Sequence, residues 1–232
     1  MDETYLFTKY PMLYHMAEDG SWPNIQRHGL LSTTAILDKW EIRGNERKSL
    51  ESQLRPGIVT LHHENYGDAK LRDQKAMKPD LLSKSLPTNI SIEDWCKYIN
   101  GRVFFWADWI GLKMLLSAKS YFNKPHVVIT VDTVRLVNSY REKITLSDMN
   151  TGSTFPRRGK TEPERRDFNT FRKIADYNSG WVTELAVDYG ITDVSNFVLS
   201  VKRYVATKKG YENEPVELEE IWNPNRNELR GS

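Results

Sequence analysis

LYHMAEDGSWPNIQRHGLLSTT, residues 13–34, predicts a strand, a short helix and a second strand in quick succession. Ser21 stands where an N-cap is expected ahead of Trp22 and Pro23, because proline is favoured near the first helical position. Gly29 stands where a helix ends in a left-handed residue. This order places His15 at the end of one strand, opposite a glycine and hydroxyl side chains. The arrangement suits a polar small molecule held against the backbone. The alternative is a tight turn with a surface histidine.

The LYH segment followed by N-x-I-x-x-HGLLS resembles the opening of DarT-type ADP-ribosyltransferases, which move ADP-ribose from NAD onto nucleic acid. The resemblance implies an α+β fold, an ADP-ribosyltransferase-like split β-sandwich of two small sheets with flanking helices. It also implies NAD as co-substrate and no metal. By position, the implied NAD-binding residues of this segment are His15, Met16, Asn24, Gly29, Leu30 and Ser32.

Length and composition favour one soluble domain spanning residues 1–232. A chain of this size can bury a real core, and a net charge of +2 requires any basic patch to be local. The single cysteine, Cys96, excludes an intrachain disulfide and a cysteine-cluster metal site, and fits a reducing cytoplasm. The acidic start and the absence of a long apolar run predict neither a signal peptide nor a membrane span.

Residues 102–106, RVFFW, are the strongest strand signal in the chain. Alternation puts Arg102 and Phe104 on one face and Phe105 on the other, so one face could stack a flat nicotinamide ring. The alternative is an ordinary central core strand. In the family that the chain resembles, such an aromatic strand follows an arginine that contacts the cofactor, which implies Arg102 and Phe105 as further NAD-binding residues.

The stretch between these two motifs contains signals of mixed clarity. Residues 58–61 predict a strand, and the adjacent His62 and His63 would point to opposite faces of it, which disfavours one shared metal ion. The polar residues 68–78 have helical spacing and predict a helix that ends at Pro79. Residues 91–94, SIED, are typical of a capping box at the start of another helix.

A local basic segment spans residues 157–173, with seven cations against three acids. Aromatic residues lie between and after these cations, a combination that holds phosphates and stacks bases in single-stranded nucleic acid. A solvated amphipathic helix explains the same pattern. We expect a nucleic-acid acceptor here, either DNA or RNA, and the candidate acceptor-binding residues are Arg157, Arg158, Tyr177 and Trp181.

Residues 181–187, WVTELAV, predict a strand with Glu184 at its centre. A carboxylate is costly to bury in such a strand unless it faces a polar cleft, although an edge strand or a salt bridge would also explain it. In DarT-type and other ADP-ribosyltransferases the catalytic residue is a glutamate on a late strand that follows a mobile loop. The resemblance therefore implies that Glu184 is catalytic.

Cleavage of the bond between nicotinamide and ribose develops positive charge on the sugar, as glycoside hydrolysis does. A carboxylate beside the ribose stabilises that charge as it appears, which lowers the barrier. The resemblance implies that His15 holds the adenosine-side ribose and that the backbone at Gly29 and Leu30 binds the nicotinamide amide. We expect Glu184 and His15 to face each other across one pocket.

Two other functions fit the sequence: an NAD-dependent RNA 2′-phosphotransferase, which shares the fold, and a non-catalytic nucleic-acid-binding module. The resemblance also leads us to expect a bacterial toxin or phage-defence effector with an antitoxin protein as partner. From Glu212 onwards the chain becomes acidic, and the simplest interpretation is a solvated tail.

Overall fold

The computed structural model describes residues 1–210 and 212–224. The α-helices are α1 (Glu3–Lys9), α2 (Trp22–His28), α3 (Thr33–Lys39), α4 (Gly44–Ser52), α5 (Pro79–Ser85), α6 (Ile92–Asn100), α7 (Trp109–Leu116) and α8 (Thr133–Tyr140). Two 3-10 helices, η1 and η2, cover Arg141–Lys143 and Val194–Asn196. The strands are β1 (Met12–Glu18), β2 (Leu30–Leu31), β3 (Val59–His63), β4 (Gly67–Leu71), β5 (Arg102–Trp106), β6 (Pro125–Asp132), β7 (Ile144–Ser147), β8 (Arg172–Lys173), β9 (Glu184–Asp188), β10 (Gly190–Ile191), β11 (Val198–Val205) and β12 (Val216–Trp222).

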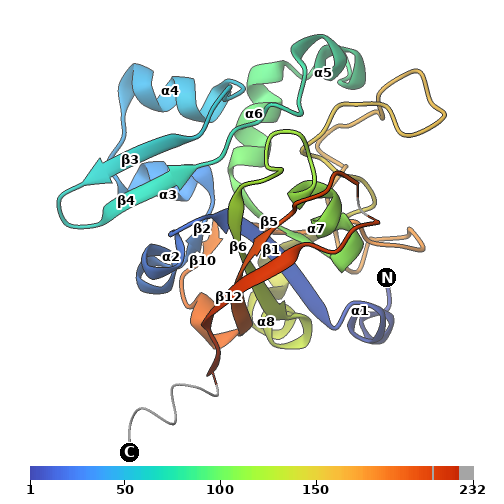
Figure 1. Ribbon diagram of the computed structural model, residues 1–232. Coiled ribbons are helices and arrows are strands. Elements are labelled where there is room, and N and C mark those ends of the chain that lie inside the picture. The colour runs from blue at the N-terminus through green and yellow to red at the C-terminus, as the bar shows by residue number, and fades with distance from the viewer. Residues whose placement is uncertain (211, 225–232) are drawn as a thin grey trace, which may run out of the picture.

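Within the described residues, eight strands form one antiparallel sheet in the order β12-β11-β6-β1-β5-β9-β7-β8. Strands β2 and β10 form a small second sheet, and β3 with β4 forms a third. Figure 1 shows α3, α4 and the β3–β4 hairpin together at one side of the large sheet, with α1 and α8 below it. The α+β class is confirmed.

A single large sheet takes the place of the two small sheets expected of a sandwich. Two of its central strands are nevertheless only sparsely paired. Strand β1 pairs with β6 along seven positions but with β5 only at Tyr14 and Trp106. We call this sparsely paired boundary between β1 and β5 the seam. At this boundary the His15 side chain donates to the backbone carbonyl oxygen of Phe104 in β5.

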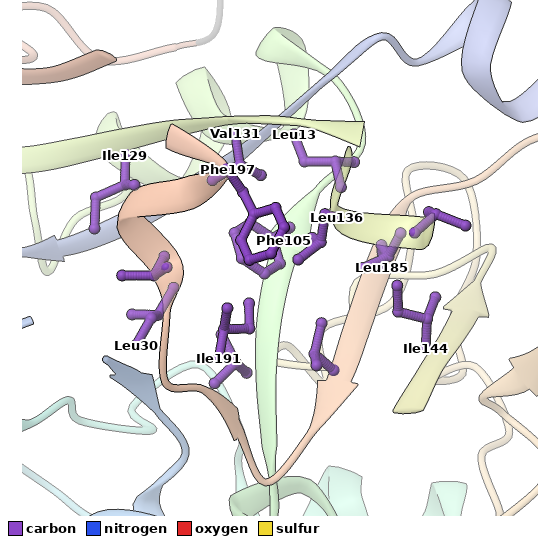
Figure 2. Packing of buried hydrophobic residues seen from close by; sticks show 14 of the residues in the cluster. Leu13, Leu30, Phe105, Ile129, Val131, Leu136, Ile144, Leu185, Ile191 and Phe197 are labelled. Carbon is purple, nitrogen blue, oxygen red and sulfur yellow. The ribbon is translucent and has the colours of Figure 1, made fainter. Parts of the chain in front are cut away.

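Apolar side chains cover both faces of the sheet. One face packs under α1, α2 and α8 around Phe105, which lies between β1 and β9 in Figure 2. The other face packs in two clusters, one around Trp95 of α6 and one around Leu112 of α7. Alternation along β1 therefore sends Leu13 to the first face and Met16 to the second.

The predicted strand, helix and strand of residues 13–34 are confirmed as β1, α2 and β2. Ser21 occupies the N-cap position of α2, although its side chain makes no capping hydrogen bond, and Pro23 lies in the first turn. Gly29 ends the helix at φ +92°, and a Cβ atom there would stand 2.6 Å from the backbone oxygen of Ile191. Only glycine allows this close approach, which fixes the helix end against the loop after β10.

Two local predictions are wrong, and one alternative is ruled out. Residues 68–78 hold strand β4 and a turn in place of a helix, because residues 67–71 pair with β3. Residues 157–171 contain no helix and form a loop before β8, which rules out the amphipathic helix given as the alternative. The acidic stretch after Glu212 was predicted to be a solvated tail, but it includes the edge strand β12. There Glu217 forms an ion pair with Lys202 of β11 at 3.0 Å. Residues 225–232 of the predicted tail lie outside the described residues.

No helix among the described residues has both the length and the apolar character that a membrane crossing requires. In the same part of the chain no three His, Cys, Asp or Glu side chains gather as a metal site would need.

Candidate functional site

A cavity of about 100 Å³ lies beside the seam, between β1, α2, β2 and β4. Four of the predicted NAD-binding residues line it: His15, Asn24, Gly29 and Leu30. They come from two strands, one helix and a helix end that the sequence placed close together. The structure therefore brings together the core of the predicted NAD site around one space.

His15 is fixed by a hydrogen bond across the seam. Its Nδ1 donates to the carbonyl oxygen of Phe104 at 2.8 Å, and its ring meets the ring of Phe105 edge-on, with centroids 5.7 Å apart. Burial lowers the pKa of His15 to about 4, an effect that the carbonyl opposes and that the charge of Arg72 reinforces. The imidazole is therefore neutral at pH 7, and Nε2 can accept a hydrogen bond from a ligand hydroxyl.

Asn24 connects α2 to the β3–β4 hairpin. Its side-chain amide nitrogen donates to the carbonyl oxygens of Tyr66 and Asp68, each at 2.9 Å. These bonds hold the hairpin as one wall of the cavity. The side chain thus shapes the space, and its donors are already used.

The other predicted NAD-binding residues lie outside the cavity lining. Met16 points into the apolar cluster under α7, because it alternates with His15 along β1. Ser32 caps α3 by accepting from the Ala35 amide at 3.1 Å. Phe105 is fully buried core behind His15. Arg102 pairs with Asp188 at 3.0 Å and stacks on the Tyr98 ring.

Sequence reasoning missed several polar and aromatic residues of the cavity lining. Glu18 ends β1, Arg72 follows β4, and His28 and Trp40 form an aromatic wall with ring centroids 5.7 Å apart. Arg72 was hidden by the mistaken helix over 68–78. Glu18 could have been predicted, because it ends the same strand that carries the candidate residue His15.

Glu184 is buried at the start of β9, with 5% of its surface exposed. One oxygen of its carboxyl group accepts from the Thr151 hydroxyl at 2.6 Å and from the Thr151 amide at 3.2 Å. Burial raises the pKa of Glu184 to about 7, while the Thr151 bonds and the charge of Arg166 act in the opposite direction. A carboxyl group with a pKa shifted towards neutrality is typical of functional sites.

The loop 148–155 covers Glu184, and Arg166 holds the loop in place. The Arg166 guanidinium donates to the carbonyl oxygens of Thr151, at 3.1 Å, and Ser153, at 3.0 Å. Thr154 adds a contact on the far side by accepting from the Lys78 amide at 2.8 Å. We call residues 148–155 the cover.

Glu184 and His15 do not face each other across one pocket, as the sequence led us to expect. Tyr14 pairs with Trp106 and Trp106 pairs with Glu184, so these three side chains share one face of the sheet. His15, one residue further along β1, belongs to the other face, and Glu184 is absent from the cavity lining. Two strand spacings separate Tyr14 and Glu184, about 10 Å between Cα atoms.

A second, larger space of about 620 Å³ opens next to the cover. We call it the basic groove: Lys84, Arg165, Arg166 and Arg172 line it against Asp148 and Asp167, and Met149 and Tyr177 complete the floor near Glu184. Tyr177 is the predicted acceptor-binding residue that lies there.

The remaining acceptor-binding candidates lie on the surface outside the groove lining. Arg157 is engaged by Glu164 at 2.7 Å and by the Asp148 carbonyl oxygen at 3.0 Å. Arg158 is exposed, and Trp181 is 51% exposed while its indole nitrogen donates to Asp148. The cations that line the groove in the structure are therefore not Arg157 and Arg158, which the sequence had suggested.

Fold and site together define an α+β protein with one seamed antiparallel sheet, a polar cavity at the seam and a buried carboxyl group under a loop. The chain belongs to a family of unknown function, DUF7002, whose family model matches residues 11–198. No curated protein and no solved structure is significantly similar to it.

Proposed function

We propose that the protein is an NAD-dependent ADP-ribosyltransferase that releases nicotinamide and transfers ADP-ribose to a nucleic acid. The observation that carries the proposal is the buried carboxyl group of Glu184 under the Thr151 loop, whose pKa burial raises to about 7. Buried carboxyl groups with a pKa shifted towards neutrality are typical of catalytic acids and bases, which supports a catalytic role for Glu184.

The cavity and Glu184 would act on different parts of one extended ligand. A volume of about 100 Å³ is well below the 300–1,000 Å³ of ordinary ligand pockets, so the cavity holds one end of a dinucleotide. The cavity and Glu184 lie on opposite faces of the sheet, so the rest of the NAD molecule would have to pass from one face to the other, and the sparsely paired seam is where it could do so. The cover would have to move away, and the hydrogen bonds from Thr151 to Glu184 are the contacts that would break.

Once uncovered, Glu184 supplies the charge that the reaction needs. Breaking the glycosidic bond leaves positive charge on the ribose, and an adjacent ionised carboxylate stabilises it in the transition state. A pKa near 7 also suits a base that removes a proton from the acceptor. His15, neutral and fixed by Phe104, would accept a hydrogen bond from a ribose hydroxyl.

The basic groove would bind the acceptor. Arg166 is buried and already donates to the cover, so Lys84, Arg165 and Arg172 are the cations of the groove that can neutralise phosphates. The lining also includes Met149, two residues after Ser147, the strand partner of Glu184. An acceptor nucleotide in the groove would thus stand next to the carboxyl group. Exposed Trp181 and Phe168 offer stacking surfaces at the same side of the molecule.

The test is incubation of the protein with NAD labelled in the adenosine part and with separate pools of DNA, RNA and protein. The proposal expects label on DNA or RNA, and a variant with Arg165 and Arg172 replaced by Gln should lose it. Arg43→Gln, at an exposed cation on the α4 side, is the matched control. Label on protein alone would contradict the nucleic-acid acceptor.

The same assay separates the alternatives. Removal of a 2′-phosphate from RNA without label on the RNA would indicate a 2′-phosphotransferase, and no NAD binding at all would indicate a non-catalytic module. A toxin acting in the cytoplasm should inhibit bacterial growth on expression, and Glu184→Ala should abolish the inhibition. An antitoxin protein would relieve it.

A further inference from the structure

Glu18 and Arg72 carry polar atoms that the fold buries without hydrogen-bond partners. Glu18 is 9% exposed and its Oε1 has no hydrogen bond, and the same is true of Nε and Nη2 of Arg72. Both residues line the cavity. Leaving buried charged groups unsatisfied is costly, which indicates that something else completes their hydrogen bonding.

The two side chains are held close to each other without satisfying each other. Arg72 Nε lies 3.4 Å from Glu18 Oε1, an ion pair longer than a normal hydrogen bond. Arg72 is anchored by Nη1, which donates to the Met16 carbonyl oxygen at 3.0 Å, and by the Tyr121 ring beneath the guanidinium at 4.5 Å. A fixed donor therefore stands beside a fixed acceptor.

The other polar groups near Glu18 do not neutralise its carboxylate. His126 Nδ1 is 3.9 Å from Glu18 Oε2, and burial lowers the pKa of His126 to about 4, so the imidazole is neutral at pH 7. Lys70, the other cation of the lining, donates to the Asp19 carbonyl oxygen at 2.8 Å. Arg72 is thus the cation closest to the Glu18 carboxylate.

We infer that Glu18 and Arg72 together recognise the amide-like edge of a planar ring, with Glu18 accepting an N–H and Arg72 donating to a neighbouring oxygen or ring nitrogen. The inference rests on the proposed NAD site and names which chemical group enters the cavity. A primary carboxamide or the amino edge of adenine has this donor and acceptor pair.

The rest of the cavity fits a ring better than a phosphate or a cation. A phosphate would meet the Glu18 carboxylate, and a cation would meet Arg72. Cavities of this order accommodate a single ring. The flat walls come from the His28 and Trp40 rings, and the apolar lining is Ala17, Ile25, Leu30, Leu31, Ile36 and Ala69.

The inference can be tested on the unmodified protein by changing the ligand. Isothermal titration calorimetry would compare NAD with two analogues: nicotinic acid adenine dinucleotide, which lacks the amide N–H, and nicotinamide purine dinucleotide, which lacks the amino group of adenine and keeps the ring nitrogen. One analogue should bind roughly tenfold or more weakly than NAD, since it leaves Glu18 without its donor. The analogue that loses affinity identifies the end of NAD held in the cavity.

Variants add an independent arm. Glu18→Gln and Arg72→Lys should each weaken NAD binding by about tenfold or more and should reduce the difference between NAD and the discriminated analogue. Asp19→Asn is the matched control, because Asp19 is the next residue but pairs with Arg203 outside the cavity lining, at 2.5 Å. Its affinity for NAD should equal that of the unmodified protein.

The outcomes separate this inference from the proposed function. Equal affinity of the unmodified protein for NAD and both analogues would overturn the inference and leave the NAD site standing. Unchanged NAD affinity in folded Glu18→Gln and Arg72→Lys would likewise overturn the inference and leave the NAD site standing. No measurable binding of NAD to the unmodified protein would overturn both.

Discussion

Thr151 donates from both its hydroxyl and its backbone amide to a single carboxylate oxygen of Glu184, at 2.6 and 3.2 Å. The two bonds stabilise the ionised form, yet burial dominates and raises the pKa of Glu184 to about 7. The carboxyl group is therefore covered and half-ionised near neutral pH. This balance has measurable consequences for stability.

Glu184→Gln should stabilise the protein more at pH 8 than at pH 5. The pKa of Glu184 rises from 4.5 in the unfolded chain to about 7 in the folded one, so the folded state binds the proton more tightly. The stability that this proton contributes is full below pH 4.5 and is lost as the pH rises through 7, a change on the order of 3 kcal/mol. Gln cannot ionise, and urea unfolding at both pH values measures the difference.

Glu93→Gln is the control for this titration. Glu93 is half-buried on the surface of α6, and its hydrogen bond to Lys97 lowers its pKa, so it is ionised at pH 5 and at pH 8. The stability difference between this variant and the unmodified protein should therefore stay constant. A constant difference for Glu184→Gln as well would contradict the buried, proton-binding carboxyl group.

The His15 imidazole should remain uncharged down to about pH 5. Burial lowers its pKa from 6.5 to about 4, so the stability it contributes is present above pH 6.5 and is lost as the pH falls through 4. The NMR chemical shift of its ring protons, assigned by comparison with His15→Gln, should be flat from pH 8 to 5. A midpoint near 6.5 would show that the ring is solvated and free of Phe104.

Gly29→Ala should destabilise the protein by roughly 2 kcal/mol or more, because a Cβ atom would meet the backbone at the loop after β10 and the residue is strained at positive φ. Gly20→Ala is matched in its positive φ of +77° but has no atom within 4 Å of the added Cβ. It should cost only about 1 kcal/mol. If urea unfolding shows the same loss of stability for Gly29→Ala and Gly20→Ala, the close approach at Gly29 does not contribute to stability.

Arg166→Met should loosen the cover, since the two carbonyl oxygens of Thr151 and Ser153 lose their donors. Limited proteolysis should then cut within residues 148–155 several times faster than in the unmodified protein. Arg158→Met, at an exposed arginine of the same segment, provides the control and should leave the rate unchanged. Identical cutting rates in the two variants would mean that other contacts hold the cover.

Local sequence patterns identified much of the site because they act over short distances. The capping signals at Ser21 and Gly29 positioned α2, and the RVFFW stretch gave β5, so His15 and the helix end could be placed together. SIED is confirmed as the capping box of α6. These features depend on backbone geometry within a few residues.

Long-range pairing could not be predicted in the same way. The polar pattern at 68–78 is compatible with a helix, and only its pairing with β3 makes it a strand that carries Arg72 into the cavity. The faces of His15 and Glu184 depend on the register of β1, β5 and β9, which joins residues that lie far apart in the sequence. Neither relationship leaves a trace in a single sequence.

The most direct test of the central claim is the release of nicotinamide from NAD, followed by chromatography with a nucleic-acid acceptor present. The unmodified protein should release nicotinamide, and Glu184→Gln should reduce the rate by about a hundredfold or more while binding NAD with similar affinity. Glu93→Gln should match the unmodified protein. Equal rates of release in Glu184→Gln and the unmodified protein would contradict the assignment of Glu184 as the catalytic residue.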